Sequence, residues 1–310
     1  MTEASGKGHA ARARLWGLGM LLCGLVVGSG AQAAGCSMFG VENRLPVLVN
    51  PKLAARTTLL CNRSYAALHS GLAHEPLWSA ERVTEEDLEG AVRVGRVTRY
   101  FHADSRLPDG DGARLSDYRE SGYDRGHLTP SGDAVDRQAQ EQTFSLANVV
   151  PQTPALNEGI WAGVEMAVRD LVHQDGSVYV VTGPAFDDDV RAIGSDNVFV
   201  PAATWKAIYD PVSGRSGAYV CRNTETPTCT TLSIAQLVSD VGIDPFPALS
   251  NTVKEQPPDL PRPEASPYRP HVRDVSRERQ SYGQGPDWQA VRRAGREALR
   301  ALSRKWEEKP

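Results

Sequence analysis

Short strand-forming runs separated by helical runs are the feature that most restricts the fold of this chain. Runs rich in β-branched or aromatic residues, each bounded by Gly, Pro or Asp, lie at residues 178–182, 205–209 and 218–221. Apolar residues recur at helical spacing over about 156–172, and a second helix is predicted at about 231–241. Strands that come in groups, with helices between them, favour an α+β layered fold over a regular βαβ alternation.

The middle of the chain reads as one domain and the C-terminal part as an appendage. Residues 34–251 contain no internal repeat and no low-complexity tract, and they are numerous enough to bury a core of their own. Closely spaced prolines then break regular structure, so we interpret residues 252–310 as a Pro-rich linker and a basic C-terminal extension. Arginines interleave with helically spaced apolar residues over 288–306, which predicts a basic amphipathic helix. Docking on its own domain and contact with nucleic acid, an anionic membrane or a partner remain open for this helix.

The first 33 residues have the three-part pattern of a cleaved secretory signal peptide. Three basic residues precede an apolar run from Leu15 to Val27, and Ala31-Gln32-Ala33 follows. The run has about 13 residues, whereas a membrane-spanning helix needs roughly 20, so an uncleaved anchor is the less favoured alternative. We therefore expect a periplasmic or secreted protein.

The cysteine count agrees with export and bears on a third alternative, a lipoprotein. Removal of the leader removes Cys23 and leaves an even set of four cysteines, for which three pairings are possible. We favour Cys36–Cys61 and Cys221–Cys229. Lipidation of Cys36 would leave one thiol without a partner, which makes the lipoprotein less favoured.

The charge of the predicted domain limits how it can hold a polyanion. The formal net charge of the chain is −4, but the leader carries +2, and residues 262–310 carry +5 from 12 Lys/Arg and 7 Asp/Glu. Residues 34–261 therefore carry −11. A domain that bound nucleic acid through a broad electrostatic footprint would be basic. Any anionic substrate must instead be gripped by a local group of cations.

Histidine, asparagine and arginine concentrate around one segment of the domain. Residues 123–133 read Tyr-Asp-Arg-Gly-His-Leu-Thr-Pro-Ser-Gly-Asp, residues 145–152 read Ser-Leu-Ala-Asn-Val-Val-Pro-Gln, and residues 156–161 read Leu-Asn-Glu-Gly-Ile-Trp. The motifs of P-loop proteins, zincins and α/β-hydrolases are absent. Phosphodiester hydrolysis needs a base, a cation and donors that neutralise the charge of the transition state, and this segment holds side chains for all three.

Each candidate residue has a chemical reason. His127 is the candidate base, because an imidazole with an ordinary pKa of about 6.5 is largely neutral at pH 7. Arg125 lies two residues earlier, so both side chains point to one face of an extended strand. Asn157 offers a neutral oxygen to Mg²⁺, which keeps most of its waters and needs only one or two protein ligands. Glu165 follows two helical turns later, too far to ligate the same ion but able to reach one of its waters.

Taken singly, these residues have plainer interpretations. A histidine beside glycine is more often structural, an asparagine such as Asn157 is often a helix cap, and Asn148 reads as a turn residue. The joint pattern outweighs the single interpretations, because a base and a ligand at a matched separation seldom coincide by accident.

Together the segments resemble the DNA/RNA non-specific endonuclease family, the group of Serratia nuclease and mitochondrial endonuclease G. Asp124-Arg125-Gly126-His127-Leu128 is similar to the family's active-site signature, and the downstream motifs follow in the family's order over roughly residues 50–250. The resemblance implies a ββα-metal (His-Me finger) site on a layered antiparallel sheet. It also implies one Mg²⁺, with Mn²⁺ as a substitute, and cleavage of DNA and RNA to 5′-phosphorylated products.

The resemblance also implies roles for single residues. His127 matches the general base and Asn157 the metal ligand. Arg99 is similar to a second phosphate-binding arginine, with Arg96 nearby as the alternative. Arg125, Asn148 and Glu165 match positions that support catalysis in the family. No stable protein partner is implied. The alternative function is a catalytically silent, exported protein of the same fold that binds nucleic acid or associates with the envelope, with its basic tail on an anionic surface.

Overall fold

The computed structural model describes residues 35–96, 100–187 and 189–265. The predicted leader, Arg99 and the predicted helix over 288–306 lie outside the described residues. In the described ranges, none of the helices has the length and apolar character needed to cross a membrane.

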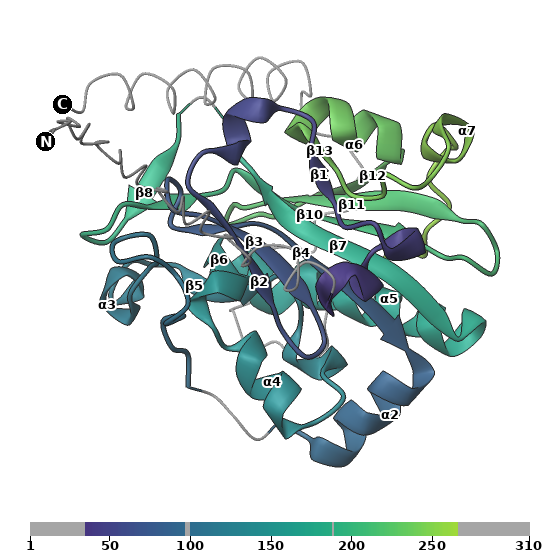
Figure 1. The fold of residues 1–310 in the computed structure, drawn as a ribbon, viewed down its shortest axis with the longest axis horizontal. Coiled ribbons are helices and arrows are strands. Elements are labelled where there is room, and N and C mark those ends of the chain that lie inside the picture. Colours follow the sequence, from purple (N-terminus) through teal and green to yellow (C-terminus); the bar gives the residue numbers. More distant parts are fainter. Residues whose placement is uncertain (1–34, 97–99, 188, 266–310) are drawn as a thin grey trace, which may run out of the picture.

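A seven-stranded antiparallel sheet forms the centre of the fold, in the order β12–β11–β10–β7–β4–β3–β2 (Figure 1). Its strands are β2 (Thr57–Cys61), β3 (Ala66–Ser70), β4 (Glu75–Thr84), β7 (Ser177–Ala185), β10 (Ala203–Tyr209), β11 (Ser216–Arg222) and β12 (Cys229–Leu232). The three runs predicted from sequence form the cores of β7, β10 and β11, which confirms them. The α+β layered antiparallel fold is confirmed as well.

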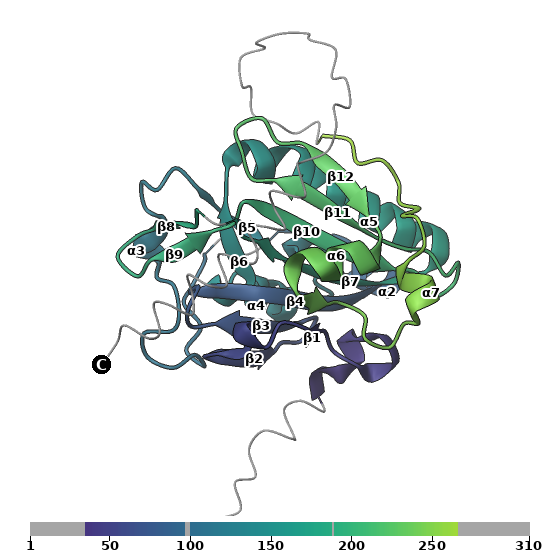
Figure 2. The same cartoon turned by 90° about the horizontal axis from the view of Figure 1, so that it is seen from above.

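Helices cover both faces of this sheet (Figures 1 and 2). On one face, α6 (Ile234–Val241) packs against alternate residues of the central strands, with Ile234 and Leu237 in one cluster with Trp205 and Val181. A short ribbon of β1 (Val47–Leu48) and β13 (Ile243–Asp244) joins this layer. Because side chains alternate along a strand, the same strands also present a second, independent set to the opposite face.

On the opposite face, α5 (Ala162–Asp175) packs over the sheet. Its Val164, Val168 and Leu171 share a cluster with Val180 of β7 and Ile208 of β10. The helix predicted over about 156–172 is confirmed, but its first part, Leu156–Trp161, is π-helical. The helix predicted at about 231–241 is confirmed as α6, which begins three residues later because β12 extends to Leu232.

Smaller elements surround the hairpin that carries the motif residues. The hairpin consists of β5 (Asp124–His127) and β6 (Val149–Gln152), and a second hairpin of β8 (Arg191–Ile193) and β9 (Val198–Val200) packs beside it. The helices α2 (Glu85–Val94), α3 (Leu115–Tyr118) and α4 (Arg137–Thr143) lie around them.

Two disulfides fasten the two edges of the large sheet. Cys36–Cys61 joins the N-terminal segment to β2, and Cys221–Cys229 joins two register partners of β11 and β12. Both favoured pairings are confirmed. The second bond closes the hairpin-like excursion predicted between residues 221 and 229.

The last described residues run back along the body of the protein. After α7 (Asn251–Lys254), the chain passes along β11, where the Tyr219 hydroxyl donates to the Pro261 carbonyl oxygen. It then reaches the start of α5, where a Cβ on Gly163 would lie 1.8 Å from the Glu264 carbonyl oxygen. Glycine at position 163 therefore permits this close approach.

Candidate functional site

The hairpin β5–β6 presents the motif residues. His127 is the register partner of Val149, and Asp124 is the partner of Gln152. The side chain of Gln152 donates from Nε2 to Thr204 Oγ1 of β10 at 2.9 Å, so the hairpin is anchored to the face of the sheet that α5 also covers. The motif strand is thus fixed at one end to the rigid centre of the fold.

The His127 ring lies between two aromatic rings. Its centroid is 5.2 Å from that of Phe101 and 5.0 Å from that of Phe144. The guanidinium carbon of Arg125 lies 4.7 Å from the centre of the same Phe101 ring, which confirms that Arg125 and His127 share one face of β5. Burial, and then the positive charges of Arg96 and Arg125, lower the pKa of His127 to about 3. The imidazole is therefore neutral at pH 7.

This lowered pKa predicts the pH dependence of activity. If His127 is the general base, kcat/KM for nucleic-acid cleavage should stay within about twofold as the pH falls from 8 to 5, instead of falling around 6.5. Arg96→Gln removes one of the charges that lower the pKa of His127, so the acidic limb should move to higher pH. Steady-state rates of both proteins, measured from pH 8 down to the lowered pKa of about 3, check both statements. A wild-type acidic limb centred near pH 6.5 would contradict them.

The same shift has a consequence for stability. Because the pKa of folded His127 lies below that of the unfolded chain, the unfolded chain binds more protons between these values. The stability that neutral His127 contributes is therefore complete above about pH 6.5, and it is lost as the pH falls toward 3.

Asn148 is fully buried and holds the backbone that follows His127. Its Oδ1 accepts a hydrogen bond from the Thr129 N–H at 3.1 Å, and its Nδ2 donates to the carbonyl oxygens of Thr129 at 2.9 Å and Thr143 at 3.0 Å. The Leu128 N–H donates to the Asn148 carbonyl oxygen at 2.9 Å. These contacts engage both ends of the Asn148 amide, so its support of the site acts through the chain that carries His127.

Replacing Asn148 by alanine should lower the free energy of unfolding by about 2–4 kcal/mol. The substitution leaves buried backbone groups of Thr129 and Thr143 without partners, and each such group costs about 1–3 kcal/mol. Urea unfolding followed by circular dichroism measures the change, and the exposed Asn251→Ala is the matched control. A loss below about 0.5 kcal/mol would contradict this role.

Asn157 lies in the π-helical segment and contacts the first residue of β5. Its Nδ2 donates to Asp124 Oδ2 at 3.0 Å. An ionised carboxylate only accepts hydrogen bonds, so the amide nitrogen must face Asp124 and the amide oxygen must face away. Asn157 and His127 are thereby linked to the two ends of one four-residue strand.

Glu165 lies one turn into α5 and belongs to a charged group. Its Oε2 is 3.8 Å from Arg169 Nη2, and Arg169 Nε donates to Asp133 Oδ1 at 2.6 Å. Burial raises the pKa of Glu165, while Arg169 and then Lys206 oppose the rise.

Arg96 interacts electrostatically with both Glu165 and His127, so the charged group of Glu165 lies on the His127 side of the molecule. Arg169 was not predicted from the sequence, although its spacing of four residues from Glu165 is typical of a helical ion pair.

Arg96 is the described arginine of the upstream pair, because Arg99 lies outside the described residues. The guanidinium carbon of Arg96 lies 5.5 Å from the centre of the Phe144 ring, which also packs on His127. An exposed cation is therefore held beside the candidate base. The role of Arg99 as a phosphate-binding residue stays a prediction.

The donor atoms at the site restrict which metal ion it could hold. In residues 35–96, 100–187 and 189–265, no group of three or more His, Cys, Asp or Glu side chains is arranged to hold a metal ion. The oriented oxygen of Asn157 and a buried His127 Nε2 that finds no partner among the described residues remain at the site. These donors fit a hydrated Mg²⁺ that takes one protein oxygen, and they do not fit a closed thiolate or histidine site.

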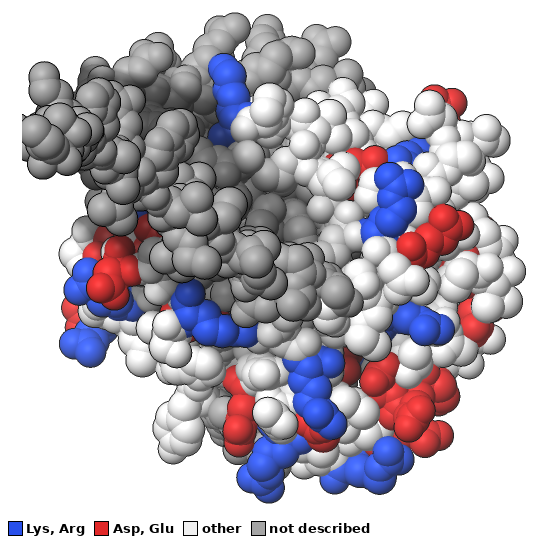
Figure 3. Space-filling model, in the orientation of Figure 1, with Lys and Arg blue, Asp and Glu red and all other residues white. Residues whose placement is uncertain are grey.

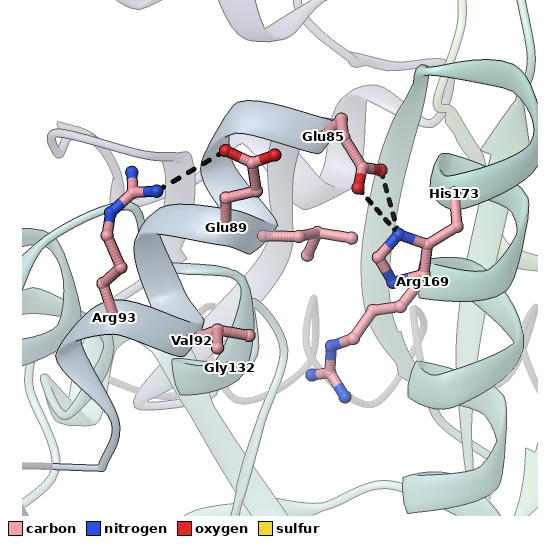
Figure 4. Close-up of a pocket in the computed structure, with 8 residues that line it drawn as sticks. Glu85, Glu89, Val92, Arg93, Gly132, Arg169 and His173 are labelled. Carbon is pink, nitrogen blue, oxygen red and sulfur yellow. Dashed lines mark hydrogen bonds and ion pairs between the residues drawn. The ribbon is translucent and has the colours of Figure 1, made fainter.

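A hollow of about 360 Å³ lies between α2 and α5, and neither His127 nor Asn157 lines it (Figure 4). Its lining residues are Glu85, Leu88, Glu89, Val92, Arg93, Gly132, Arg169 and His173. Figure 4 shows Glu85 and His173 facing one another across it, with 2.9 Å between His173 Nδ1 and Glu85 Oε2. Acidic side chains gather over α2 (Figure 3), which disfavours a polyanion there. Its lining includes Gly132 of the motif segment and Arg169, but not Arg125, His127, Asn148, Asn157 or Glu165.

The hairpin that carries His127, followed by a helical segment that carries Asn157, defines the ββα-metal class of nucleases. A family model described as DNA/RNA non-specific endonuclease matches residues 48–251, well over half of the chain. The chain belongs to this family. Its members are hydrolytic nucleases that act on nucleic acid.

Individual relatives agree with this assignment. The chain is 34% identical over 206 residues to the mitochondrial nuclease EXOG of Danio rerio, and the match covers 60% of this chain and 59% of the relative. It is 33% identical to the mitochondrial endonuclease G of Bos taurus, covering 49% and 54%. In the crystal structure of the EndoG/EndoGI complex, one chain is similar with a TM-score of 0.53 and 25% identity, covering 58% of this chain and 82% of that one. The matches thus span less than two thirds of the length of the nucleases from Danio rerio and Bos taurus.

The predicted periplasmic or secreted location is wrong. The relatives from Danio rerio and Bos taurus, and a nuclease from Schizosaccharomyces pombe that is 34% identical, are mitochondrial. The export prediction depended mainly on the leader, with which the even cysteine count agreed, and basic residues at the N-terminus are common to secretory and organellar leaders. That pattern therefore carried less information about location than we assigned to it.

Proposed function

We propose that the protein is a sugar-non-specific endonuclease that hydrolyses phosphodiester bonds of DNA and RNA with Mg²⁺. The observation that carries the proposal is His127, a neutral imidazole held between two aromatic rings with a buried Nε2 that finds no partner among the described residues. A buried nitrogen without a partner is costly in a structural histidine, and it suits a group that receives a proton from water.

In this proposal His127 takes a proton from the water whose oxygen attacks phosphorus. The P–O3′ bond breaks as the new P–O bond forms, and the departing 3′-oxygen takes a proton from a second water molecule, which leaves a 3′-hydroxyl and a 5′-phosphate. Arg125 and Arg96 place positive charge beside the imidazole, where the phosphate gains negative charge in the transition state. Local cations of this kind allow an acidic domain to hold a polyanion.

Asn157 would hold the Mg²⁺ through Oδ1, with Asp124 fixing the orientation of the amide. When bound, the ion withdraws negative charge from phosphate oxygens and stabilises the leaving oxygen. Glu165, which pairs with Arg169, would orient a water of the bound ion without ligating it, and Mn²⁺ is the expected substitute. We assign the activity to residues 34–251 and regard residues 252–310 as an extension.

Digestion tests the proposal directly. Supercoiled plasmid and a structured RNA are incubated with the purified chain in Mg²⁺, in Mn²⁺ and in chelator. Both substrates should be cut with either ion and spared in chelator, and product ends should accept ligation only when they carry a 5′-phosphate. Persistence of both substrates in Mg²⁺ would reject the enzyme and favour the silent nucleic-acid-binding alternative.

A further inference from the structure

The two residues after His127 have their polar atoms held by specific partners from two sides. On one side Asn148 engages the N–H groups of Leu128 and Thr129 and the Thr129 carbonyl oxygen. The Leu128 carbonyl oxygen and the Thr129 hydroxyl remain, and both turn to the large sheet.

On the sheet side, Lys206 of β10 donates from Nζ to the Leu128 carbonyl oxygen at 3.1 Å. The same Nζ donates to Thr182 Oγ1 of β7 at 2.6 Å. The hydroxyls of Ser79 in β4 and Thr129 lie 2.7 Å apart and form a further hydrogen bond. The segment that leaves His127 therefore rests on polar side chains of the sheet.

The register explains why these side chains act together. Ser79 pairs with Thr182, and Thr182 pairs with Lys206, so the three lie in one row across β4, β7 and β10. We call Ser79, Thr182 and Lys206 the polar row. Two residues further along β4, Glu81 faces the same side, because side chains two apart in a strand share a face.

Burial of the Lys206 side chain at this position is energetically unfavourable, because its ammonium group loses contact with water. It is 1% exposed, and its ammonium lies 5.5 Å from the centre of the Trp161 ring. Burial lowers the pKa of Lys206, and the charges of Glu81 and Glu165 oppose that change. Burying an ammonium group costs free energy that an apolar side chain of similar volume would not, so packing alone gives no reason for a lysine here.

We propose that Lys206 is a positioning residue for the general base, and this inference rests on the proposed function. By fixing the Leu128 carbonyl oxygen, Lys206 sets the direction in which the backbone leaves His127, and so the place of the imidazole relative to the scissile phosphate. The charge of Glu81 opposes the effect of burial, which lowers the pKa of Lys206. A displacement of about 1 Å in a reacting group lowers rates by as much as 10²-fold, so the loss of this contact should be visible in kcat.

The experiment compares Lys206→Met with wild type in steady-state cleavage of a short fluorescent DNA. We expect kcat to fall roughly 10- to 100-fold with KM within about twofold, because the contact places the base and does not touch substrate. Lys254→Met is the matched control, since Lys254 pairs with Asp244 on the α6 side, and its kcat should stay at the wild-type value. Glu81→Gln combined with Lys206→Met removes the buried amine together with the carboxyl group that interacts with it, and keeps the test valid if the single variant unfolds.

A second background separates positioning from a general structural role. In a chain carrying His127→Gly, added imidazole restores part of the rate without depending on the backbone that held the native ring. Lys206→Met should lower this restored rate by less than about twofold if Lys206 acts through His127. An equal loss in both backgrounds, or a wild-type kcat in Lys206→Met, overturns the inference. Absence of cleavage by both wild type and Lys254→Met overturns the proposed function, and the inference with it.

Discussion

Replacement of His127 by alanine should lower kcat/KM for DNA and RNA cleavage by on the order of 10²–10⁴, the usual contribution of a positioned general base. The ring fills the space between Phe101 and Phe144, so the vacated volume can admit a small base. Added imidazole should therefore restore part of the activity, with a rate that rises with the concentration of its neutral form. Cleavage of a fluorescent oligonucleotide with and without imidazole measures both effects.

His173→Ala is the matched control for this experiment. His173 is an exposed histidine that faces Glu85 at the hollow between α2 and α5, and its removal should leave kcat/KM within about twofold. Activity of His127→Ala near the wild-type level would exclude the imidazole as the base. A loss of equal size in His173→Ala would indicate that any histidine removal disturbs the fold.

The second large effect concerns the proposed metal ligand. Asn157→Ala removes the only side-chain oxygen that we assign to Mg²⁺, so the Mg²⁺ concentration for half-maximal rate should rise at least 10- to 100-fold, the range found when residues around a metal site are changed. The maximal rate should fall as well, because the ion is then held less firmly. Rate measured against Mg²⁺ concentration checks this.

Two further variants sharpen the interpretation of Asn157. Asn251→Ala, at an exposed asparagine in α7, should leave the metal titration unchanged. Asp124→Asn should shift the titration in the same direction as Asn157→Ala but less, because Asp124 orients the amide through one hydrogen bond. An unchanged titration in Asn157→Ala would remove this residue from the metal site.

Local sequence patterns predicted those strands whose residue types favour a strand and whose ends are marked by turn-forming residues. β7, β10 and β11 were predictable because their β-branched and aromatic residues lie between Gly, Pro or Asp. The strand β4 was missed, although it lies next to β7, the central strand of the sheet. Its side toward α5 carries Ser79 and Glu81 where an apolar pattern would place core residues, and these are the positions that support the site.

Helical patterns were predictable in the same uneven way. The stripe over 156–172 was found, but the π-helical start was not, since it depends on the backbone of Gly159 with φ −100° and ψ −112°. The helix α2 was missed because its first turn is acidic, Leu88 and Ala91 are its buried apolar residues, and Val92 is 83% exposed. A sparse apolar face gives a weak helical period.

Some features of the candidate site could be predicted from the sequence and others could not. The shared face of Arg125 and His127 follows from the two-residue period of a strand, and the structure confirms it. The support from Lys206 could not be found from sequence, because Lys206 and Leu128 are 78 residues apart and meet only through the order of strands in the sheet. Asn148 was found as a motif residue, whereas its contacts with Thr129 and Thr143 required the fold.

The placement of the two disulfides bears on how this protein behaves when it is reduced. The seven-stranded sheet has two edge strands, β2 and β12. Backbone groups at a sheet edge can pair with a strand of another molecule, so edge strands are sites of local unfolding and of association. Here β2 and β12 are each tied down by a covalent bond at one end. Reducing agents release both margins at once, so self-association and clouding of the solution should precede any loss of the central strands.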